Sequence, residues 1–136
     1  MTSGMNLLKR LIGGRSAPAE TTFTAPIAPD GPIVAIGDVH GCLPPLDKLL
    51  ARVDALPGSR PIVCVGDYVD RGEDSAGVLR RLHDRALAAP ESFVCLTGNH
   101  EEMMLRFLDD PAANGARWLR YGGLQTLASF DVRGIS

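Results

Sequence analysis

Three short apolar runs divide the chain into repeating units. They are residues 33–36, 61–65 and 93–96, and each is apolar at nearly every position rather than at alternate ones. Continuous apolar runs of this length are typical of strands in a parallel sheet that is covered on both faces. The pattern therefore predicts three buried strands.

A segment with apolar residues at helical spacing follows each run. In the first segment Pro44 and Pro45 suit the opening turn of a helix, and in the second Asp74 or Ser75 can cap one. The third helix is expected just after the block that ends at Glu101. The apolar positions that define the three helices are Leu43, Leu46, Leu49, Leu50 and Val53, then Val78, Leu79, Leu82 and Ala86, and finally Met103, Met104, Phe107 and Leu108.

Strands that alternate with helices predict an α/β fold, a parallel βαβαβ sheet with right-handed crossover helices. Beyond the third helix the pattern is weaker. Trp118 and Tyr121 precede a Gly122-Gly123 break and a short apolar segment that ends at Phe130. We expect the two aromatic residues to anchor the last helices rather than to border a substrate crevice.

The first 30 residues are expected to form a flexible segment and linker, followed by one domain over residues 31–136. Residues 16–32 are rich in alanine, proline and threonine, which suits an extended linker. Residues 1–15 mix basic residues with leucines and lack a convincing cleavage site. A frayed terminus is therefore favoured over a signal peptide, with a weak amphipathic surface helix as the alternative.

The 136-residue chain has 45% hydrophobic and 22% charged residues, which is typical of one globular domain. Its formal net charge is -2, and no run of Lys or Arg occurs, so a nucleic-acid partner is not expected. No apolar run approaches the ~18–20 residues of a membrane span.

The cysteines, Cys42, Cys64 and Cys95, are odd in number, which favours a reducing, cytoplasmic setting and a packing role for all three.

Polar residues follow each apolar run, in the blocks GDVHG at 37–41, GDYVDRG at 66–72 and GNHE at 98–101. Because the carboxyl ends of parallel strands meet in one crevice, we expect these side chains to come together. Carboxylates, imidazoles and an amide oxygen are ligands of divalent ions such as Mn²⁺, Fe²⁺ or Zn²⁺. A bound cation would also offset the repulsion between the carboxylates. The candidate site residues are Asp38, His40, Asp67, Asp70, Arg71, Asn99 and His100.

Elementary chemistry assigns tasks to three of these residues. His100 can act as a general acid if Asp70 holds its ring, and the Arg71 guanidinium can bind an anion. Two structural alternatives stay open, in which Asp70 and Arg71 pair only with each other or His100 caps its own helix. The acidic residues Glu101 and Glu102 are explained by the helix dipole alone.

The blocks GDVHG, GDYVDRG and GNHE together resemble the signature motifs of the calcineurin-like metallophosphoesterases. The DRG ending and the final Glu resemble the phosphoprotein phosphatase (serine/threonine) branch of bacterial type. The resemblance covers about residues 33–130. It implies a metal-dependent phosphoric monoester hydrolase in which a metal-bound hydroxide attacks the phosphate in line. The implied substrate is phosphoserine or phosphothreonine in proteins, or another small phosphoester.

Two alternatives to a protein phosphatase follow from the same motifs. A dinucleoside polyphosphate hydrolase is the alternative enzyme, although that branch commonly resembles GNHD where this chain has Glu101. A truncated, non-catalytic module that binds metal or phosphate is the alternative outside catalysis.

The resemblance also implies the metal ligands. Asp38 and His40 would hold the first ion, Asp67 would bridge both ions, and Asn99 would hold the second. Two divalent ions are implied, with Mn²⁺ favoured and Fe²⁺/Fe³⁺ or Zn²⁺ as alternatives.

The catalytic roles follow the same pattern. His100 would be the general acid, and Asp70 would orient it. Arg71, Asn99 and His100 would bind the substrate phosphate.

The sequence departs from the family pattern after His100. Family members complete the second metal site with two histidines from a later sheet, whereas this chain has no histidine beyond His100. We therefore expect the first half of an αββα sandwich, either as the amino-terminal part of a longer phosphatase or as a shortened relative. The missing sheet would leave one face of the apolar strands uncovered, which predicts self-association through that face.

Overall fold

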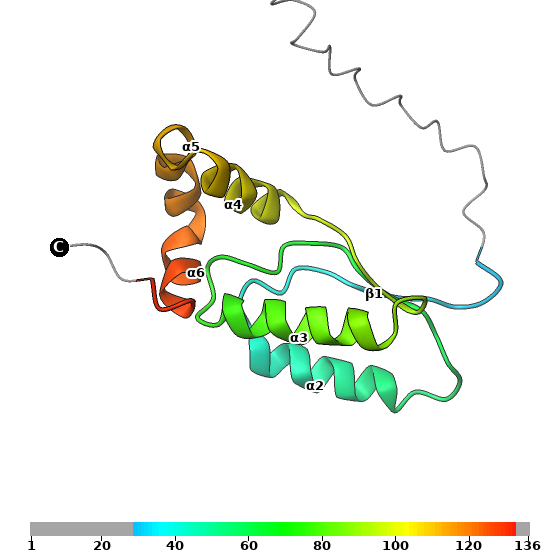
Figure 1. Cartoon of the computed structure of the whole chain (residues 1–136). Coiled ribbons are helices and arrows are strands. Elements are labelled where there is room, and N and C mark those ends of the chain that lie inside the picture. The colour runs from blue at the N-terminus through cyan, green and yellow to red at the C-terminus, as the bar shows by residue number, and fades with distance from the viewer. Residues whose placement is uncertain (1–28, 133–136) are drawn as a thin grey trace, which may run out of the picture.

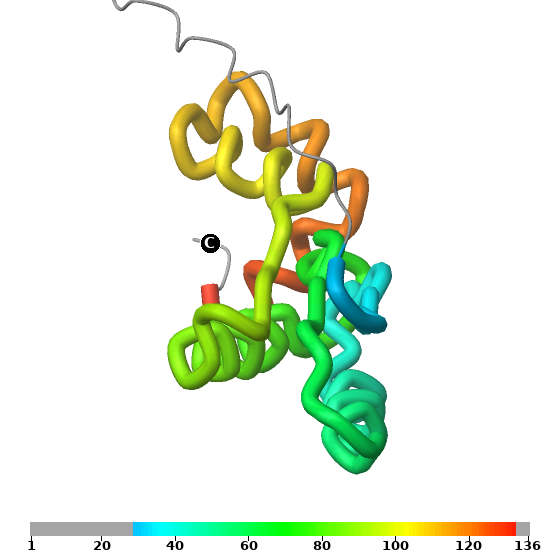
Figure 2. Tube along the Cα trace, turned by 90° about the vertical axis from the view of Figure 1, so that its right-hand side faces the viewer, coloured from blue at the N-terminus to red at the C-terminus, as the bar shows by residue number. Residues whose placement is uncertain are grey.

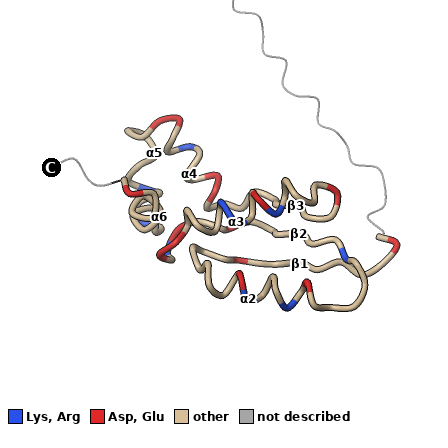
Figure 3. Tube along the Cα trace, turned by 60° about the horizontal axis from the view of Figure 1, so that its bottom comes forward, with Lys and Arg blue, Asp and Glu red and all other residues tan. Residues whose placement is uncertain are grey.

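The computed structural model of the chain describes residues 29–132 (Figure 1). Its three strands form one parallel sheet in the order β1 (Val34–Ile36), β2 (Ile62–Cys64) and β3 (Phe93–Cys95), and they lie side by side (Figure 3). The last residue of each strand is opposite the last residue of its neighbour, so all three end level. The predicted βαβαβ sheet is confirmed. The predicted terminal segment before residue 29 lies outside the described residues.

The crossover helices α2 (Leu43–Asp54) and α3 (Ser75–Ala88) lie on the same face of the sheet (Figure 1). The Asp74 side chain caps α3, because it accepts a hydrogen bond of 2.7 Å from the Gly77 N–H. The apolar faces of both helices bury the inward side of the strands, as their spacing predicts. The core between these layers contains Ile36, Leu46, Leu50, Ile62, Cys64, Val78, Leu82 and Phe93.

The opposite face of the sheet is open. Val65 and Leu96, just beyond the ends of β2 and β3, are 47% and 49% exposed, and Val94 within β3 is 41% exposed. The apolar runs predict cover on both faces, and the described part of the chain supplies it on one. The uncovered face that the sequence predicts is therefore present among the described residues.

A helical arm follows β3. It consists of α4 (Asn99–Asp109), α5 (Pro111–Trp118), the π-helix η1 (Leu119–Gly123) and α6 (Leu124–Ser129). The arm turns back on itself, so that α6 contacts α3 (Figure 2). Among the described helices, none has both the length and the apolar character that a membrane crossing requires.

The turn of the arm depends on the predicted glycine break. Gly122 has φ 109°, a conformation that favours glycine, and a Cβ on Gly123 would lie 2.6 Å from the Trp118 ring. The Trp118 ring also packs on Phe107, with 4.6 Å between the ring centroids. Trp118 is therefore the expected anchor, but Tyr121 is 50% exposed and the anchoring role predicted for it is wrong.

Candidate functional site

The loops after β1 and β2 are joined by backbone hydrogen bonds. The His40 N–H donates to the Asp67 carbonyl at 2.9 Å, and the Gly41 N–H donates to the Tyr68 carbonyl at 2.8 Å. The loops approach so closely that a Cβ on Gly72 would overlap the His40 carbonyl oxygen. The first two sequence blocks therefore share one crevice at the carboxyl end of the sheet, as predicted.

His40 and Asp67 present ligand atoms to this crevice. The His40 Nδ1 lies 2.8 Å from the Val69 carbonyl, so Nδ1 carries the ring proton and Nε2 keeps a free lone pair. The Asp38 carboxylate lies 3.9 Å from that Nε2. Ligand atoms of His40, Asp67 and His100 lie within 4.8 Å of one another. Imidazole nitrogens and a carboxylate form a donor set that fits a divalent ion. His40 and Asp67 of the predicted first group therefore come together, whereas Asp38 lies outside this close cluster, although it approaches His40.

His100 and Asp70 form a buried pair next to these ligands. The distance from Nδ1 to Oδ2 is 2.7 Å, and the two residues are 2% and 0% exposed. The other ring nitrogen, Nε2, lies 3.2 Å from the Arg71 guanidinium. Arginine can only donate, so Nε2 accepts a hydrogen bond from Arg71. Nδ1 therefore carries the ring hydrogen and donates it in a hydrogen bond to Asp70. Both nitrogens of His100 thus have hydrogen-bond partners in this structure.

Trp118 and Thr126 also bind the Asp70 carboxylate, although their sequence positions predict no chemical role for them. The Trp118 Nε1–H donates to both carboxylate oxygens at 2.9 and 3.0 Å, and the Thr126 hydroxyl donates to one of them at 2.8 Å. The Asp70 N–H donates to the hydroxyls of Thr126 and Ser75. The alternatives in which Asp70 pairs only with Arg71, or His100 only caps its helix, are therefore wrong.

Glu101 fixes the loop that carries the site. One of its carboxylate oxygens accepts hydrogen bonds from the N–H groups of Asp67 and Gly98 at 2.7 and 2.9 Å. The other accepts from those of Tyr68 and Val69 at 2.7 and 3.2 Å. The helix-dipole explanation of Glu101 is therefore incomplete. Its spacing from Gly98 is that of a capping box, which is the sequence signal for part of this role.

Replacing Glu101 by Gln is expected to destabilise the fold by about 1–3 kcal/mol. The amide nitrogen of Gln would face two backbone N–H donors and leave them unsatisfied in a buried place. Urea unfolding of the full chain measures the change. Glu102→Gln is the matched control, because Glu102 is exposed and its change is expected to stay within about 0.5 kcal/mol. Equal unfolding midpoints for the two variants would contradict the role given to Glu101.

Four of the predicted site residues have left-handed backbone. His40, Asp67, Asp70 and Arg71 have φ values of 43°, 57°, 72° and 69°. Such a conformation costs about 1–3 kcal/mol for a residue other than glycine and persists only where the surroundings enforce it. The hydrogen bonds to Glu101 and between the loops provide that enforcement.

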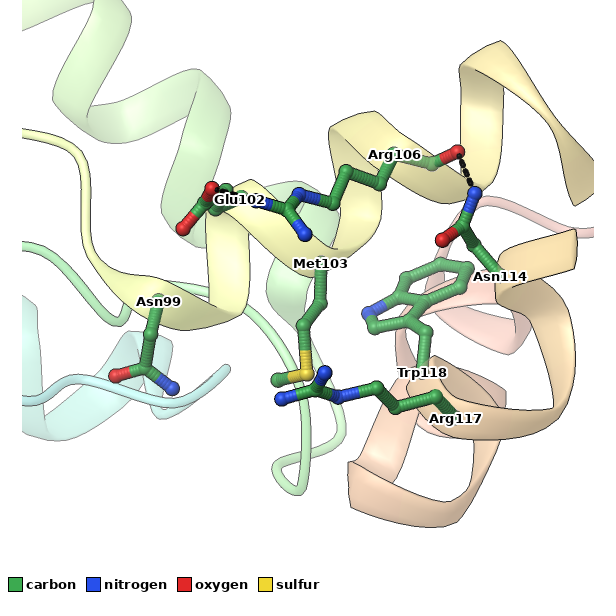
Figure 4. Close-up of a pocket in the computed structure, with 7 residues that line it drawn as sticks. All are labelled: Asn99, Glu102, Met103, Arg106, Asn114, Arg117 and Trp118. Carbon is green, nitrogen blue, oxygen red and sulfur yellow. Dashed lines mark hydrogen bonds and ion pairs between the residues drawn. The ribbon is translucent and has the colours of Figure 1, made fainter.

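Asn99 and Arg71 lie at the solvent side of the site. Asn99 is the first residue of α4, and its amide projects from the first turn of that helix (Figure 4). Both residues are exposed, as groups that meet a substrate must be. The donors predicted for the second ion, Asp67 and Asn99, number two where a closed zinc site has four.

Nearby hydroxyl and thiol groups are not poised as nucleophiles. Burial raises the pKa of the Tyr68 hydroxyl well above its usual range, and this group lies 2.9 and 2.7 Å from the carbonyls of Cys64 and Leu96. Burial also raises the pKa of the Cys64 thiol to about 12. Cys42 and Cys95 are exposed, so the packing role predicted for the cysteines holds for Cys64 alone.

Comparison with known proteins gives a family match and partial relatives. Residues 31–134 match the calcineurin-like phosphoesterase family. The symmetrical bis(5'-nucleosyl)-tetraphosphatase of Pseudomonas putida (strain GB-1) is 42% identical over 71 residues, which are 52% of this chain and 23% of that protein. Serine/threonine-protein phosphatase 1 of Salmonella typhimurium (strain LT2) is 38% identical over 89 residues, 65% of this chain and 37% of that protein. The matched part thus spans well under half of either relative.

Proposed function

Because this chain belongs to the calcineurin-like phosphoesterase family, we propose that it hydrolyses phosphate monoesters with divalent metal ions, and that its substrates are phosphoserine or phosphothreonine residues of proteins. The observation that carries the proposal is the buried pair of His100 and Asp70, 2.7 Å apart, beside the cluster of His40 and Asp67. An acid and a group of metal ligands in one crevice are the two parts that this reaction needs.

In the proposed mechanism Asp38, His40 and Asp67 would hold the first ion, and Asp67 and Asn99 would hold the second. Bound divalent ions supply Lewis-acid polarisation of the phosphoryl group and lower the pKa of a coordinated water. The backbone N–H of Asp67 donates to Glu101 at 2.7 Å, and this hydrogen bond fixes the backbone from which the Asp67 carboxylate projects. A fixed carboxylate suits a ligand that both ions would share.

The proton needed by the leaving group comes from His100. The Nδ1–H of His100 keeps its hydrogen bond to Asp70, whose negative charge stabilises the imidazolium. Nε2 must itself carry a proton before it can donate one to the leaving group. An Nε2 that accepts a hydrogen bond from Arg71, as it does at 3.2 Å, is not protonated. Arg71 therefore has to leave Nε2 when His100 is charged, and a phosphate group is the partner that its planar fork suits.

Two observations favour a protein phosphatase over a dinucleotide hydrolase. The match to the Salmonella phosphatase covers 65% of this chain, against 52% for the Pseudomonas tetraphosphatase. Glu101 also uses both carboxylate oxygens to bind four backbone N–H groups. The aspartate of a GNHD block, which is typical of the dinucleotide branch, has a shorter side chain that would not reach all four. The higher identity of the tetraphosphatase, 42%, keeps dinucleoside polyphosphates as the second candidate substrate.

We expect Mn²⁺-dependent release of phosphate from a phosphoserine peptide to exceed cleavage of diadenosine tetraphosphate when both are offered to the full chain at equal concentration. Liberated phosphate and nucleotide products are the measured quantities. Preferred cleavage of the dinucleotide would overturn the protein phosphatase assignment. Binding of Mn²⁺ without turnover of either substrate would identify a non-catalytic module.

A further inference from the structure

A cavity of about 200 Å³ lies between α4 and α5 (Figure 4). Asn99 lies at one end of it, next to His100 in the chain, and Trp118 forms a wall at the other end. The Nε1–H of that same indole donates to Asp70 at 2.9 Å. Trp118 therefore belongs both to the cavity wall and to the surroundings of Asp70, and Asn99 links the cavity to the start of α4, where His100 lies.

The lining of this cavity carries one excess positive charge. Arg106 and Glu102 both line it and pair with each other along α4, which cancels their charges. Arg117 also lines it, and within residues 29–132 no acidic side chain pairs with its guanidinium. An exposed arginine in a cavity lining, with no ion pair among the described residues, attracts anions.

Asn114 and Met103 also line the cavity. The Asn114 amide N–H group is already used, because it donates to the carbonyls of Arg106 and Asp110 at 3.0 and 3.1 Å. Met103 extends from α4 toward the side chain of Arg117 (Figure 4). A water molecule needs about 10–15 Å³ of such space, so the cavity can hold a phosphate or carboxylate group with its hydration.

We propose that this cavity binds a second anionic group of the substrate, adjacent to the phosphate that is hydrolysed, with Arg117 as the binding cation. The assignment rests on the proposed function for the position of the first phosphate. The second anion is either a further phosphate of a polyphosphate chain or the carboxylate of an acidic residue beside a phosphorylated one. Both fit the planar donor fork of arginine.

Binding in the absence of divalent ions tests this site without turnover. Tripolyphosphate and orthophosphate are titrated by calorimetry into the full chain, into Arg117→Gln and into the control Arg120→Gln, which alters an exposed arginine outside the cavity lining. Trp118 is the only tryptophan of the chain, so its fluorescence reports whether the ligand enters this cavity. We expect tripolyphosphate to bind more tightly than orthophosphate and to lose ~10-fold or more in affinity in Arg117→Gln alone.

A second pair of ligands separates the two sources of the anion. A phosphoserine peptide with a neighbouring glutamate is compared with the same peptide carrying glutamine. A preference for the glutamate peptide that disappears in Arg117→Gln would assign the site to acidic phosphoproteins. A loss confined to tripolyphosphate would assign it to polyphosphate chains.

Equal affinities in the unmodified chain, Arg117→Gln and Arg120→Gln for every ligand would overturn the proposal. Because these affinities are measured without catalysis, that failure is distinct from failure of the hydrolase assignment, which appears as an absence of phosphate release.

Discussion

Asp67→Asn is expected to weaken Mn²⁺ binding by more than ~10²-fold and to reduce metal-dependent phosphate release at least as much. Even partners of metal ligands cost about 10–100-fold in affinity when they are removed, and Asp67 is itself a proposed ligand to both ions. Asparagine keeps the oxygen that accepts the His100 N–H, at 3.1 Å in the structure, so the loop is expected to stay folded. The loss then arises from the missing charge.

Calorimetric titration with Mn²⁺ measures this prediction directly, and circular dichroism verifies the fold. Asp109→Asn is the matched control, because Asp109 is an exposed residue at the end of α4 with no ion pair among the described residues. An unchanged Mn²⁺ affinity in Asp67→Asn would show that the ion does not depend on this crevice.

Asp70→Asn is expected to lower the hydrolysis of a phosphoserine peptide by about 10³–10⁴-fold. In the serine-protease triad the same change of a carboxylate behind a histidine costs about 10⁴-fold, because the histidine is held in the wrong tautomer. The side chain of Asp70 accepts hydrogen bonds from His100, Trp118 and Thr126. An amide would turn one of its acceptors into a donor, so either His100 changes tautomer or a buried N–H loses its partner.

The leaving group distinguishes a catalytic role of Asp70 from a structural one. An aryl phosphate releases a phenolate that needs little protonation, whereas phosphoserine releases an alkoxide that needs an acid. We therefore expect Asp70→Asn to impair the peptide far more than the aryl phosphate. Trp118→Phe, which removes one donor to Asp70 but keeps the pair with His100, is expected to have a smaller effect. Equal losses on both substrates would show that Asp70 acts only through folding.

The apolar pattern predicts the number and direction of the strands but not their length. Val65 and Leu96 continue the apolar runs beyond β2 and β3, yet the regular strands end at Cys64 and Cys95. The N–H groups of Val65 and Leu96 still donate to the carbonyls of Ile36 and Cys64 on the neighbouring strands, at 2.9 and 2.8 Å, so the backbone pairing extends one residue beyond each regular strand. Val65 and Leu96 both lie next to the exposed sheet face, where the described chain offers no second layer.

The ligands and the acid could be predicted because each follows a strand, and level parallel strands bring their ends together. The supports of Asp70 could not be predicted in the same way. Trp118 and Thr126 are 48 and 56 residues away in the sequence. The reversal between α4 and α5 brings Trp118 back, and the turn at Gly122 then brings Thr126 back. The fourfold acceptor role of Glu101 likewise depends on how closely two loops approach.

The left-handed backbone at His40, Asp67 and Arg71 has a consequence for evolution. Glycine adopts this conformation at no steric cost, so at these positions it would relieve strain while deleting the side chains on which turnover depends. Proteins need only enough stability to function, and activity often opposes further stability. A lineage released from selection for catalysis is therefore expected to lose these residues early, because drift toward a more stable chain and drift toward an inactive one point to the same substitutions.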